Sequence, residues 1–231
     1  MNYSIIIYII GMILKLEAAF MVLPIVTSLI YQETSGFAFL ITIILCLAIG
    51  IPLTWKKPTR KAFYTKEGFV TVALSWIVLS IMGAIPFVIS HSIPNPIDAL
   101  FETVSGFTTT GASILNNVEA LPHCMLIWRS FTHWIGGMGV LVFILSLLPL
   151  TGGYHMNLMK AESPGPSVSK LAPKVQSTAK ILYTIYFAMT VVQMILLLLG
   201  GMPLFDTICT AFGTAGTGGF GIKNDSMASY S

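Results

Sequence analysis

The stretch GFTTTGAS at residues 106–113 places a run of Gly, Ala, Ser and Thr between two long apolar segments. A loop that only joins two membrane-crossing segments needs no such run. A second stretch, GTAGTGGFG at residues 213–221, also follows an apolar segment and a short amphipathic one. The role of these two runs has to be inferred from the segments around them.

The composition indicates a membrane protein. Only 9% of the residues are charged, 55% are hydrophobic and the mean hydropathy is +0.84, whereas a soluble domain carries about a quarter charged residues. Apolar stretches of about 20 residues can cross a bilayer core of about 30 Å, and the chain has five: Ile5–Ile30, Gly36–Trp55, Phe69–Ser90, Met125–Leu150 and Ile181–Gly201. These runs are continuous rather than alternating, so they predict an all-α polytopic membrane protein and exclude a β-barrel.

Other classes of protein are not favoured. The first segment has neither a basic flank nor a small-residue cleavage site, so we expect no cleavable signal peptide. GTGGFG at 216–221 fits a dinucleotide-binding pattern, but no strand–helix unit surrounds it. No nucleophile–base pair or H-E-x-x-H occurs, so we expect no enzyme. Cys46, Cys124 and Cys209 have no paired spacing and are expected to be small buried apolar residues.

The basic residues predict the orientation. They gather between the second and third spans and between the fourth and fifth, while the segments 31–35 and 91–124 contain no Lys or Arg. Cytoplasmic loops of membrane proteins carry an excess of these residues. We therefore expect a cytoplasmic N-terminus, with both Gly/Thr runs on the outer side. This distribution also explains the net charge of +3 without a nucleic-acid partner.

The two runs belong to an internal repeat. Placing Asp98 over Asp206 also aligns Gly111 with Gly219, so the two pairs share one spacing along the chain, which we call the repeat offset. Each copy reads as a basic segment, an apolar span, a Pro, an Asp, a short apolar helix and then the Gly/Thr run. Repeats in membrane transporters place the substrate site at the interface between the copies.

Each short helix has a predicted start. In the first copy Asn95 is the expected N-cap, Pro96 takes the first position and Asp98 meets the free N–H groups and the positive helix end. Pro203 and Asp206 are placed similarly in the second copy. A charge-relay role for the two aspartates is the alternative to capping. Helices of about 10 residues are too short to cross, so both are expected to be re-entrant.

The Gly/Thr runs suit a cation filter. Irregular backbone at membrane depth is tolerated where it lines a water-filled cavity or is buried in protein. Glycine permits unusual backbone angles, and a ring of carbonyls can replace the hydration shell of an ion. The negative end of a re-entrant helix favours a cation. No ring of carboxylates is present, so a monovalent ion is expected.

The residues resemble a known family at this point. LFETVSGFTTTGAS, HWIGGMGVLVFILSLLPL, KAESPGPSVSKLAPKVQSTAK and GGMPLFDTICTAFGTAGTGGFG are similar to the membrane subunit of the Trk/Ktr/HKT potassium transporter superfamily, on the TrkH branch. The resemblance implies two leading helices followed by four helix–pore loop–helix repeats. It implies potassium as the transported ion, moved passively or by symport with H⁺ or Na⁺, and no organic cofactor or other metal. The implied K⁺-binding residues are Thr108, Thr109, Thr110, Gly111, Thr217, Gly218 and Gly219.

The chain holds only part of that pattern. The resemblance divides it into two leading helices with a basic loop (1–65), a first repeat (66–150), a cytoplasmic loop (151–177) and a second repeat that stops after its filter (178–231). We expect the chain to be a fragment or truncation of a Trk-type transporter, because two repeats are missing. The alternative is a truncated, non-conducting chain that binds or modulates full-length subunits.

The resemblance also implies partners and a location. The family acts as a homodimer in the bacterial inner membrane, with a cytosolic ring of nucleotide-binding regulatory subunits. The loop 151–180 would face that ring. The implied partners of this chain are therefore potassium, a second membrane subunit, the regulatory subunit and the lipid bilayer.

Several further residues have open interpretations. Arg129 is expected to extend its charge to the interface, with pairing to Glu102 or Glu119 as the alternative. His123, Cys124 and His133 are not expected to bind a metal, because they point apart or lie turns apart. GGMG at 136–139 is expected to let helices approach closely. Lys15 and Glu17 lie within the first span and need separate partners.

Overall fold

The computed structural model describes residues 3–56, 58, 65–139 and 175–230, and within these ranges every regular element is helical. The elements in chain order are α1 (Tyr3–Phe20), α2 (Val22–Ile30), α3 (Gly36–Thr54), α4 (Thr65–Ile89), α5 (Pro96–Phe107), η1 (Val118–Ala120), α6 (His123–Met138), α9 (Val175–Leu199), α10 (Leu204–Ala215) and η3 (Ala228–Tyr230).

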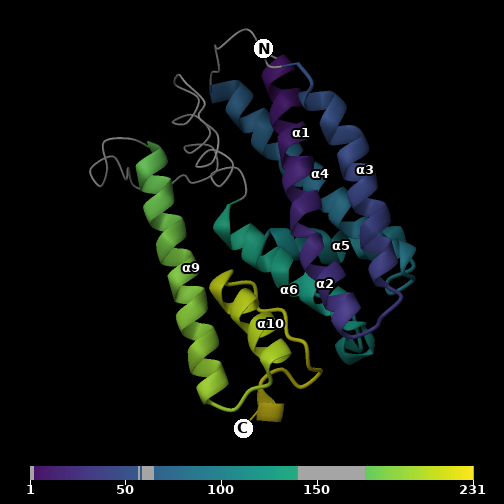
Figure 1. Cartoon of the computed structure of the whole chain (residues 1–231), viewed down its shortest axis with the longest axis vertical. Helices are drawn as coiled ribbons and strands as arrows, with labels where there is room; N and C mark the ends of the chain where they lie inside the picture. The colour runs from purple at the N-terminus through teal and green to yellow at the C-terminus, as the bar shows by residue number, and fades with distance from the viewer. Residues whose placement is uncertain (1–2, 57, 59–64, 140–174, 231) are drawn as a thin grey trace.

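Four stretches of helix are long and apolar enough to cross a membrane: Tyr3–Ile30, Gly36–Thr54, Lys66–Ile89 and Lys180–Leu199. These helices run along the long axis of the molecule, and α2 ends at the opposite end of the bundle from the N-terminus (Figure 1). They agree with four of the five predicted spans. The remaining one, predicted at 125–150, begins as α6, and its residues 140–150 lie outside the described part of the chain.

The first span is interrupted at Met21, which separates α1 from α2. Pro24 explains the interruption, because its ring clashes with the carbonyl four residues earlier and it has no N–H to donate. The two helices still follow one another as a single membrane-crossing unit. The apolar pattern predicts a span at Ile5–Ile30 and does not locate the break within it.

Small residues bring the leading helices together. α1 packs against both α3 and α4. A Cβ on Gly11 would lie 3.0 Å from the carbonyl oxygen of Gly50, and a Cβ on Gly50 would lie 3.0 Å from the carbonyl oxygen of Gly11. Glycine at such a crossing lets two membrane helices approach at backbone distance. α4 packs against both helices of this hairpin, and α2 packs against α6.

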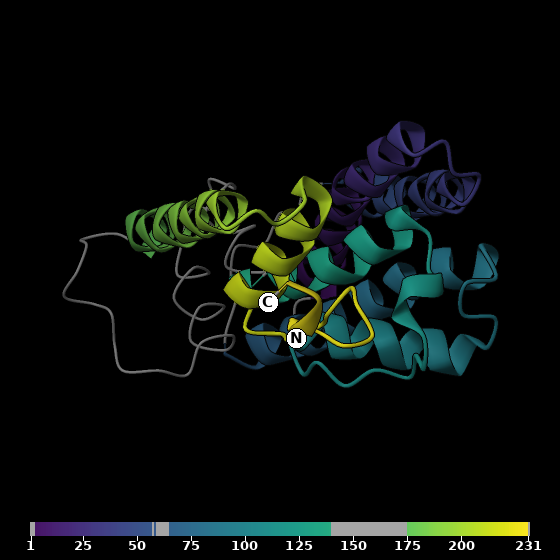
Figure 2. The same cartoon turned by 90° about the horizontal axis from the view of Figure 1, so that it is seen from below.

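α5 and α10 are the two short helices of the predicted repeat. α5 lies near the middle of the long axis and α10 lies in the half away from the N-terminus (Figure 1), and the view from below shows α10 beside α9 (Figure 2). Each has 12 residues, so each is about 18 Å long and does not span a core of about 30 Å. α5 packs against α4 and α6, while α10 packs against α6 and α9. α6 therefore lies between the two short helices and contacts both.

The two short helices repeat one another. α5 begins at Pro96 and ends at Phe107, and α10 begins at Leu204 and ends at Ala215, so the helix starts and the helix ends both keep the repeat offset. The helix starts differ in detail. The side chain of Asn95 accepts a hydrogen bond from the N–H of Ile97 at 3.0 Å, whereas α10 begins after Pro203 without a side-chain cap.

Candidate functional site

The loop after α5 begins with a tight reversal of the backbone. The N–H of Thr109 donates to the carbonyl of Gly106 at 3.1 Å, and the N–H of Thr110 donates to the carbonyl of Ser105 at 2.9 Å. Thr109 has a φ of 53°, in the left-handed region. These are the two bonds and the left-handed residue of a Schellman motif, which is usually closed by glycine. Here a threonine closes it.

The loop after α10 has the same construction. The N–H of Thr217 donates to the carbonyl of Thr214, and the N–H of Gly218 donates to the carbonyl of Gly213, both at 2.9 Å. Thr217 has a φ of 55°. A residue other than glycine adopts a positive φ in only a few per cent of cases. Two threonines that share this conformation at the repeat offset show that the repeat extends to the backbone.

The two loops also match at a glycine that follows the threonine. Gly111 has a φ of 75° and Gly219 a φ of 85°. Each loop therefore has a left-handed threonine and, two residues later, a left-handed glycine. We call residues 108–111 the first filter loop and residues 216–219 the second filter loop.

The two filter loops touch one another. A Cβ on Gly111 would overlap the carbonyl oxygen of Gly218 and would lie 3.9 Å from the Cα of Gly219. Only a residue without a side chain fits at Gly111. The structure thus brings together two loops that are far apart in sequence. Thr108, Thr110, Thr217 and Gly219 are exposed, so the loops are accessible from outside the chain.

One threonine hydroxyl is already engaged. The Oγ1 of Thr108 donates to the carbonyl of Val104 at 2.7 Å, and it lies 2.8 Å from the Oγ1 of Thr110. The hydroxyl of Thr108 therefore stabilises the end of α5.

α6 supports both loops from behind. A Cβ on Gly136 would overlap the carbonyl oxygen of Phe107, and a Cβ on Gly137 would lie 2.6 Å from the Cα of Gly216. The GGMG segment therefore allows the close approach that the sequence predicted. His133, one turn earlier, stacks on Phe220 with the ring centroids 4.0 Å apart.

The position of Arg129 differs from the one expected from the sequence. It does not extend to the interface, because only 3% of its side chain is exposed, and it pairs with Glu102, which is 1% exposed. The pairing was the alternative interpretation. Glu119, the other candidate partner, is exposed and accepts the N–H of Asn224 at 3.0 Å. A charge pair buried at this depth has to be satisfied within the protein, since leaving either charge alone is costly.

Glu33, in the turn between α2 and α3, holds the start of α6. Its Oε1 accepts the N–H of His123 at 2.7 Å, and its Oε2 accepts the N–H of Cys124 at 3.0 Å. Partial burial raises the pKa of the Glu33 carboxyl, but these bonds and one from the His123 ring outweigh it, so that pKa lies below its ordinary value. Sequence reasoning missed this residue, although its lone charge in a short turn was visible.

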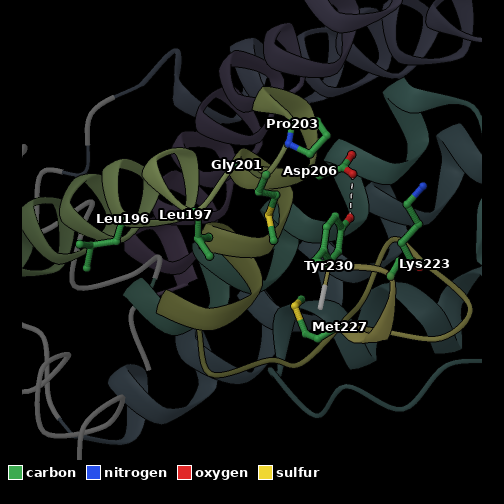
Figure 3. A pocket seen from close by; sticks show the side chains of 11 residues that line it. Leu196, Leu197, Gly201, Pro203, Asp206, Lys223, Met227 and Tyr230 are labelled. Atoms are coloured by element: carbon green, nitrogen blue, oxygen red, sulfur yellow. Dashed lines mark hydrogen bonds between the residues drawn. The ribbon is translucent and has the colours of Figure 1, made fainter.

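The predicted aspartates have different surroundings. Asp98 lies in the first turn of α5, and Asp206 lies in the first turn of α10. The carboxylate of Asp206 accepts a hydrogen bond from the hydroxyl of Tyr230 at 2.7 Å, at the wall of a hollow of about 760 Å³ (Figure 3). Burial, followed by this bond, raises the pKa of Tyr230. Lys223 lines the same hollow.

Among the residues that the structure describes, no group of three His, Cys, Asp or Glu side chains could hold a metal ion. His123 bonds to Glu33 at 2.8 Å rather than approaching His133. All three cysteines are buried, as expected for small apolar residues. Glu17 is fully buried, and neither of its carboxylate oxygens has a hydrogen-bond partner in the described structure.

Comparison with known proteins gives consistent matches. The family model described as "TrkH: Cation transport protein" matches residues 35–231. The Trk system potassium uptake protein TrkH of Salmonella typhimurium is 40% identical over 234 aligned residues, which cover 100% of this chain and 48% of that protein. The Trk system potassium uptake protein TrkG of Escherichia coli K12 is 37% identical, covering 95% of this chain and 46% of that protein.

A solved structure matches as well. The crystal structure of the potassium transporter TrkH from Vibrio parahaemolyticus aligns with a TM-score of 0.79 at 32% sequence identity. The alignment covers 97% of this chain and 45% of that protein. The chain therefore spans about half the length of the relatives that it matches.

Proposed function

The chain belongs to the TrkH family of cation transport proteins, and on this premise we propose that it supplies two of the loops that form a potassium-selective filter. It is a membrane protein, and four stretches of its described part are long and apolar enough to cross a bilayer. Its relatives carry the name of potassium uptake proteins. Potassium is therefore the ion that we assign to the proposed filter.

One observation supports the proposal most strongly. The two filter loops have the same hydrogen bonds and the same left-handed positions, and they are in contact at Gly111 and Gly218. A filter needs equivalent loops around a common axis, so that carbonyls from each loop can replace the water around one ion. We assign the ion-binding carbonyls to Thr109 and Thr110 in the first loop and to Thr217 and Gly218 in the second, with Thr108, Gly111 and Gly219 completing the lining.

The helices favour a positive ion. Each filter loop follows the C-terminal end of a 12-residue helix, where the helix dipole is negative. A divalent ion such as Ca²⁺ takes six to eight oxygen ligands, several of them carboxylates. Glu102, the acidic side chain nearest the first loop in sequence, is engaged by Arg129. Backbone carbonyls and a helix dipole are suited to a monovalent cation.

Two loops do not enclose an ion. We therefore propose that the complete filter includes two further loops from the part of the transporter that lies beyond this chain's matched region. Residues 1–231 alone are expected not to conduct. The proposal covers both passive movement of potassium and coupling to H⁺ or Na⁺. No observation favours a separate role as a non-conducting modulator.

The arrangement also supports an orientation. The turn at 31–35, which contains no Lys or Arg, lies at the end of the bundle away from the N-terminus (Figure 1). We propose that this end, with the filter loops, faces the outside of a bacterial inner membrane and that the N-terminus is cytoplasmic. The homodimer and the cytosolic nucleotide-binding subunit are proposed on the family resemblance. Residues 151–174 of the loop assigned to that subunit lie outside the described residues, and residues 175–180 begin α9.

The test is a chimera. Residues 1–231 replace the matched half of the Vibrio parahaemolyticus protein, and uptake of Rb⁺ and Na⁺ is measured in cells without other potassium uptake. Gly111→Ser should lower the selectivity for Rb⁺ over Na⁺, because a side chain there forces the loops apart. Gly201→Ser is the matched control, since Gly201 also has a positive φ of 87° but ends α9 away from the filter loops. Unchanged selectivity in Gly111→Ser would remove the filter assignment.

Expression of residues 1–231 alone gives a second test. Cells that lack potassium uptake should fail to grow at low potassium when they produce only this chain. Robust growth would contradict the requirement for further loops.

A further inference from the structure

We propose that the buried pair of Glu102 and Arg129 is a positioning device that fixes the two filter loops relative to one another. The proposal rests on the proposed function, because the spacing that it fixes is that of the filter. Both residues act through the backbone and do not contact the ion. We call residues 112–114 and 220–222, which follow the filter loops, the exit segments.

Glu102 holds the first exit segment. Its Oε1 accepts the hydroxyl of Ser113 at 2.9 Å and also pairs with the Nε of Arg129, while its Oε2 accepts the N–H of Ile114 at 2.9 Å. Both oxygens of a fully buried carboxylate are thus used. Hydrogen bonds to a charged group are shorter and about twice as strong as neutral ones.

Arg129 holds the second exit segment. Its Nη1 donates to the carbonyl of Gly221 at 2.8 Å, and its guanidinium carbon lies 3.6 Å from the centre of the Phe220 ring. The ring of Phe220 also stacks on His133, a second residue of α6. One guanidinium therefore joins a carboxylate of α5 to the backbone and the aromatic side chain of the second exit segment.

The two anchor points are equivalent. Ser113 in the first copy and Gly221 in the second are separated by the repeat offset, as the filter glycines are. The second copy carries Thr210 where the first carries Glu102, so the carboxylate is not repeated. A single buried pair thus fastens corresponding points of both loops.

Polar contacts between the two copies beyond the exit segments lie nearer the solvent. Asn224 bonds to the side chains of Asn117 and Glu119 and to the N–H of Val118, and all of these bonds are exposed. Exposed polar contacts contribute little because water competes for the same groups. The buried pair is a contact between the two copies that water does not screen.

Two conservative substitutions test the attachment of each exit segment separately. Glu102→Gln removes the negative charge that strengthens both bonds and turns an NH₂ group toward a donor, so the bond from Ile114 and that from Arg129 are each weakened or lost. Arg129→Lys keeps the charge beside Glu102, but one ammonium on a flexible stem lacks the planar fork that reaches Gly221 at the same time. Glu119→Gln is the matched control, because it changes a carboxylate that also bridges the loops but is exposed.

The experiment uses the whole 231-residue chain in detergent micelles, with spin labels on cysteines introduced at Asn116 or Lys223. Cys46, Cys124 and Cys209 are buried, so the label reacts at the introduced site. Hydrogen exchange of the Ile114 amide is measured in parallel. Circular dichroism confirms that each variant keeps its helices.

Glu102→Gln should speed exchange of the Ile114 amide by about tenfold or more, as expected for loss of a charge-assisted bond. Arg129→Lys should increase label mobility at 223 and leave the Ile114 amide protected. Glu119→Gln should change neither. If Glu102→Gln leaves exchange unchanged, or if Arg129→Lys leaves the label at 223 as ordered as in the parent chain, the positioning role is overturned.

Transport separates this inference from the proposed function. In the chimera, Arg129→Lys should lower the selectivity for Rb⁺ over Na⁺ severalfold while Glu119→Gln does not. If the spin label shows a freed second exit segment but selectivity is unchanged, the positioning role stands and the filter assignment fails. If neither changes, the positioning role fails and the filter assignment is untouched.

Discussion

Replacing Gly111 with alanine should destabilise the chain more than the same replacement at Gly219, although the two glycines occupy equivalent positions. Both have positive φ values, 75° and 85°. An alanine in this region costs about 1–2 kcal/mol. Replacing glycine also restricts the unfolded chain, which offsets about 0.4–1 kcal/mol at each site. These two contributions are the same for both positions.

Space distinguishes the two sites. A Cβ on Gly111 would overlap the carbonyl oxygen of Gly218, whereas a Cβ on Gly219 meets no atom within 4 Å. Relieving an overlap in packed protein costs about 1–3 kcal/mol. Gly111→Ala should therefore lower the free energy of unfolding by about 1–3 kcal/mol more than Gly219→Ala does.

The assay is reversible unfolding in mixed micelles, followed by circular dichroism as the denaturing detergent is increased. Gly201→Ala serves as a third variant, because Gly201 has a φ of 87° and also meets no atom within 4 Å. It should lose as much free energy of unfolding as Gly219→Ala. Equal losses for Gly111→Ala and Gly219→Ala would show that the filter loops do not touch, and would refute the account of the site.

Three further substitutions test the supports of the site. Glu33→Gln should lower the free energy of unfolding at pH 7 by about 0.5–1 kcal/mol. Because folding depresses the pKa of Glu33, the parent chain is more stable than the variant above the unfolded pKa of about 4.3, and this difference should vanish as the pH falls through the folded pKa. A difference in stability that persists in acid would contradict the capping role. Gly136→Ala should cost about 1–3 kcal/mol in the same unfolding assay, since its Cβ overlaps the carbonyl of Phe107, and a neutral result would argue against that close approach. Asn95→Ala should cost about 1 kcal/mol through loss of the bond from Ile97, with Asn95→Ser expected to restore most of it.

Local signals made much of the fold predictable. Continuous apolar runs predicted the membrane-crossing stretches, and four of them appear in the described residues. The repeat offset came from matching aspartates and glycines, and it reappears in the ends of α5 and α10. Signals of this kind depend on residues close together in sequence. The GGMG segment is similar, because small residues in a span predict close packing wherever the partner lies.

The surroundings of Arg129 were not predictable in the same way. Hydropathy places an arginine near the end of a span at the interface, and this default is wrong here because Glu102 lies on another helix, 27 residues away. Sequence pattern does not say which helix faces meet. The anchors at Ser113 and Gly221 belong to the same class, since each depends on a contact between segments that are distant in the chain.

The most direct measurement of the central claim is the response of the loop carbonyls to potassium. The chimera is labelled with ¹³C at the carbonyls of Thr109 and Thr217, and solid-state NMR follows both signals as K⁺ replaces Na⁺ in the membrane sample. Both carbonyls should shift together, with one midpoint, because a single ion contacts both loops. Carbonyls that ignore potassium, or a shift confined to one loop, would contradict it.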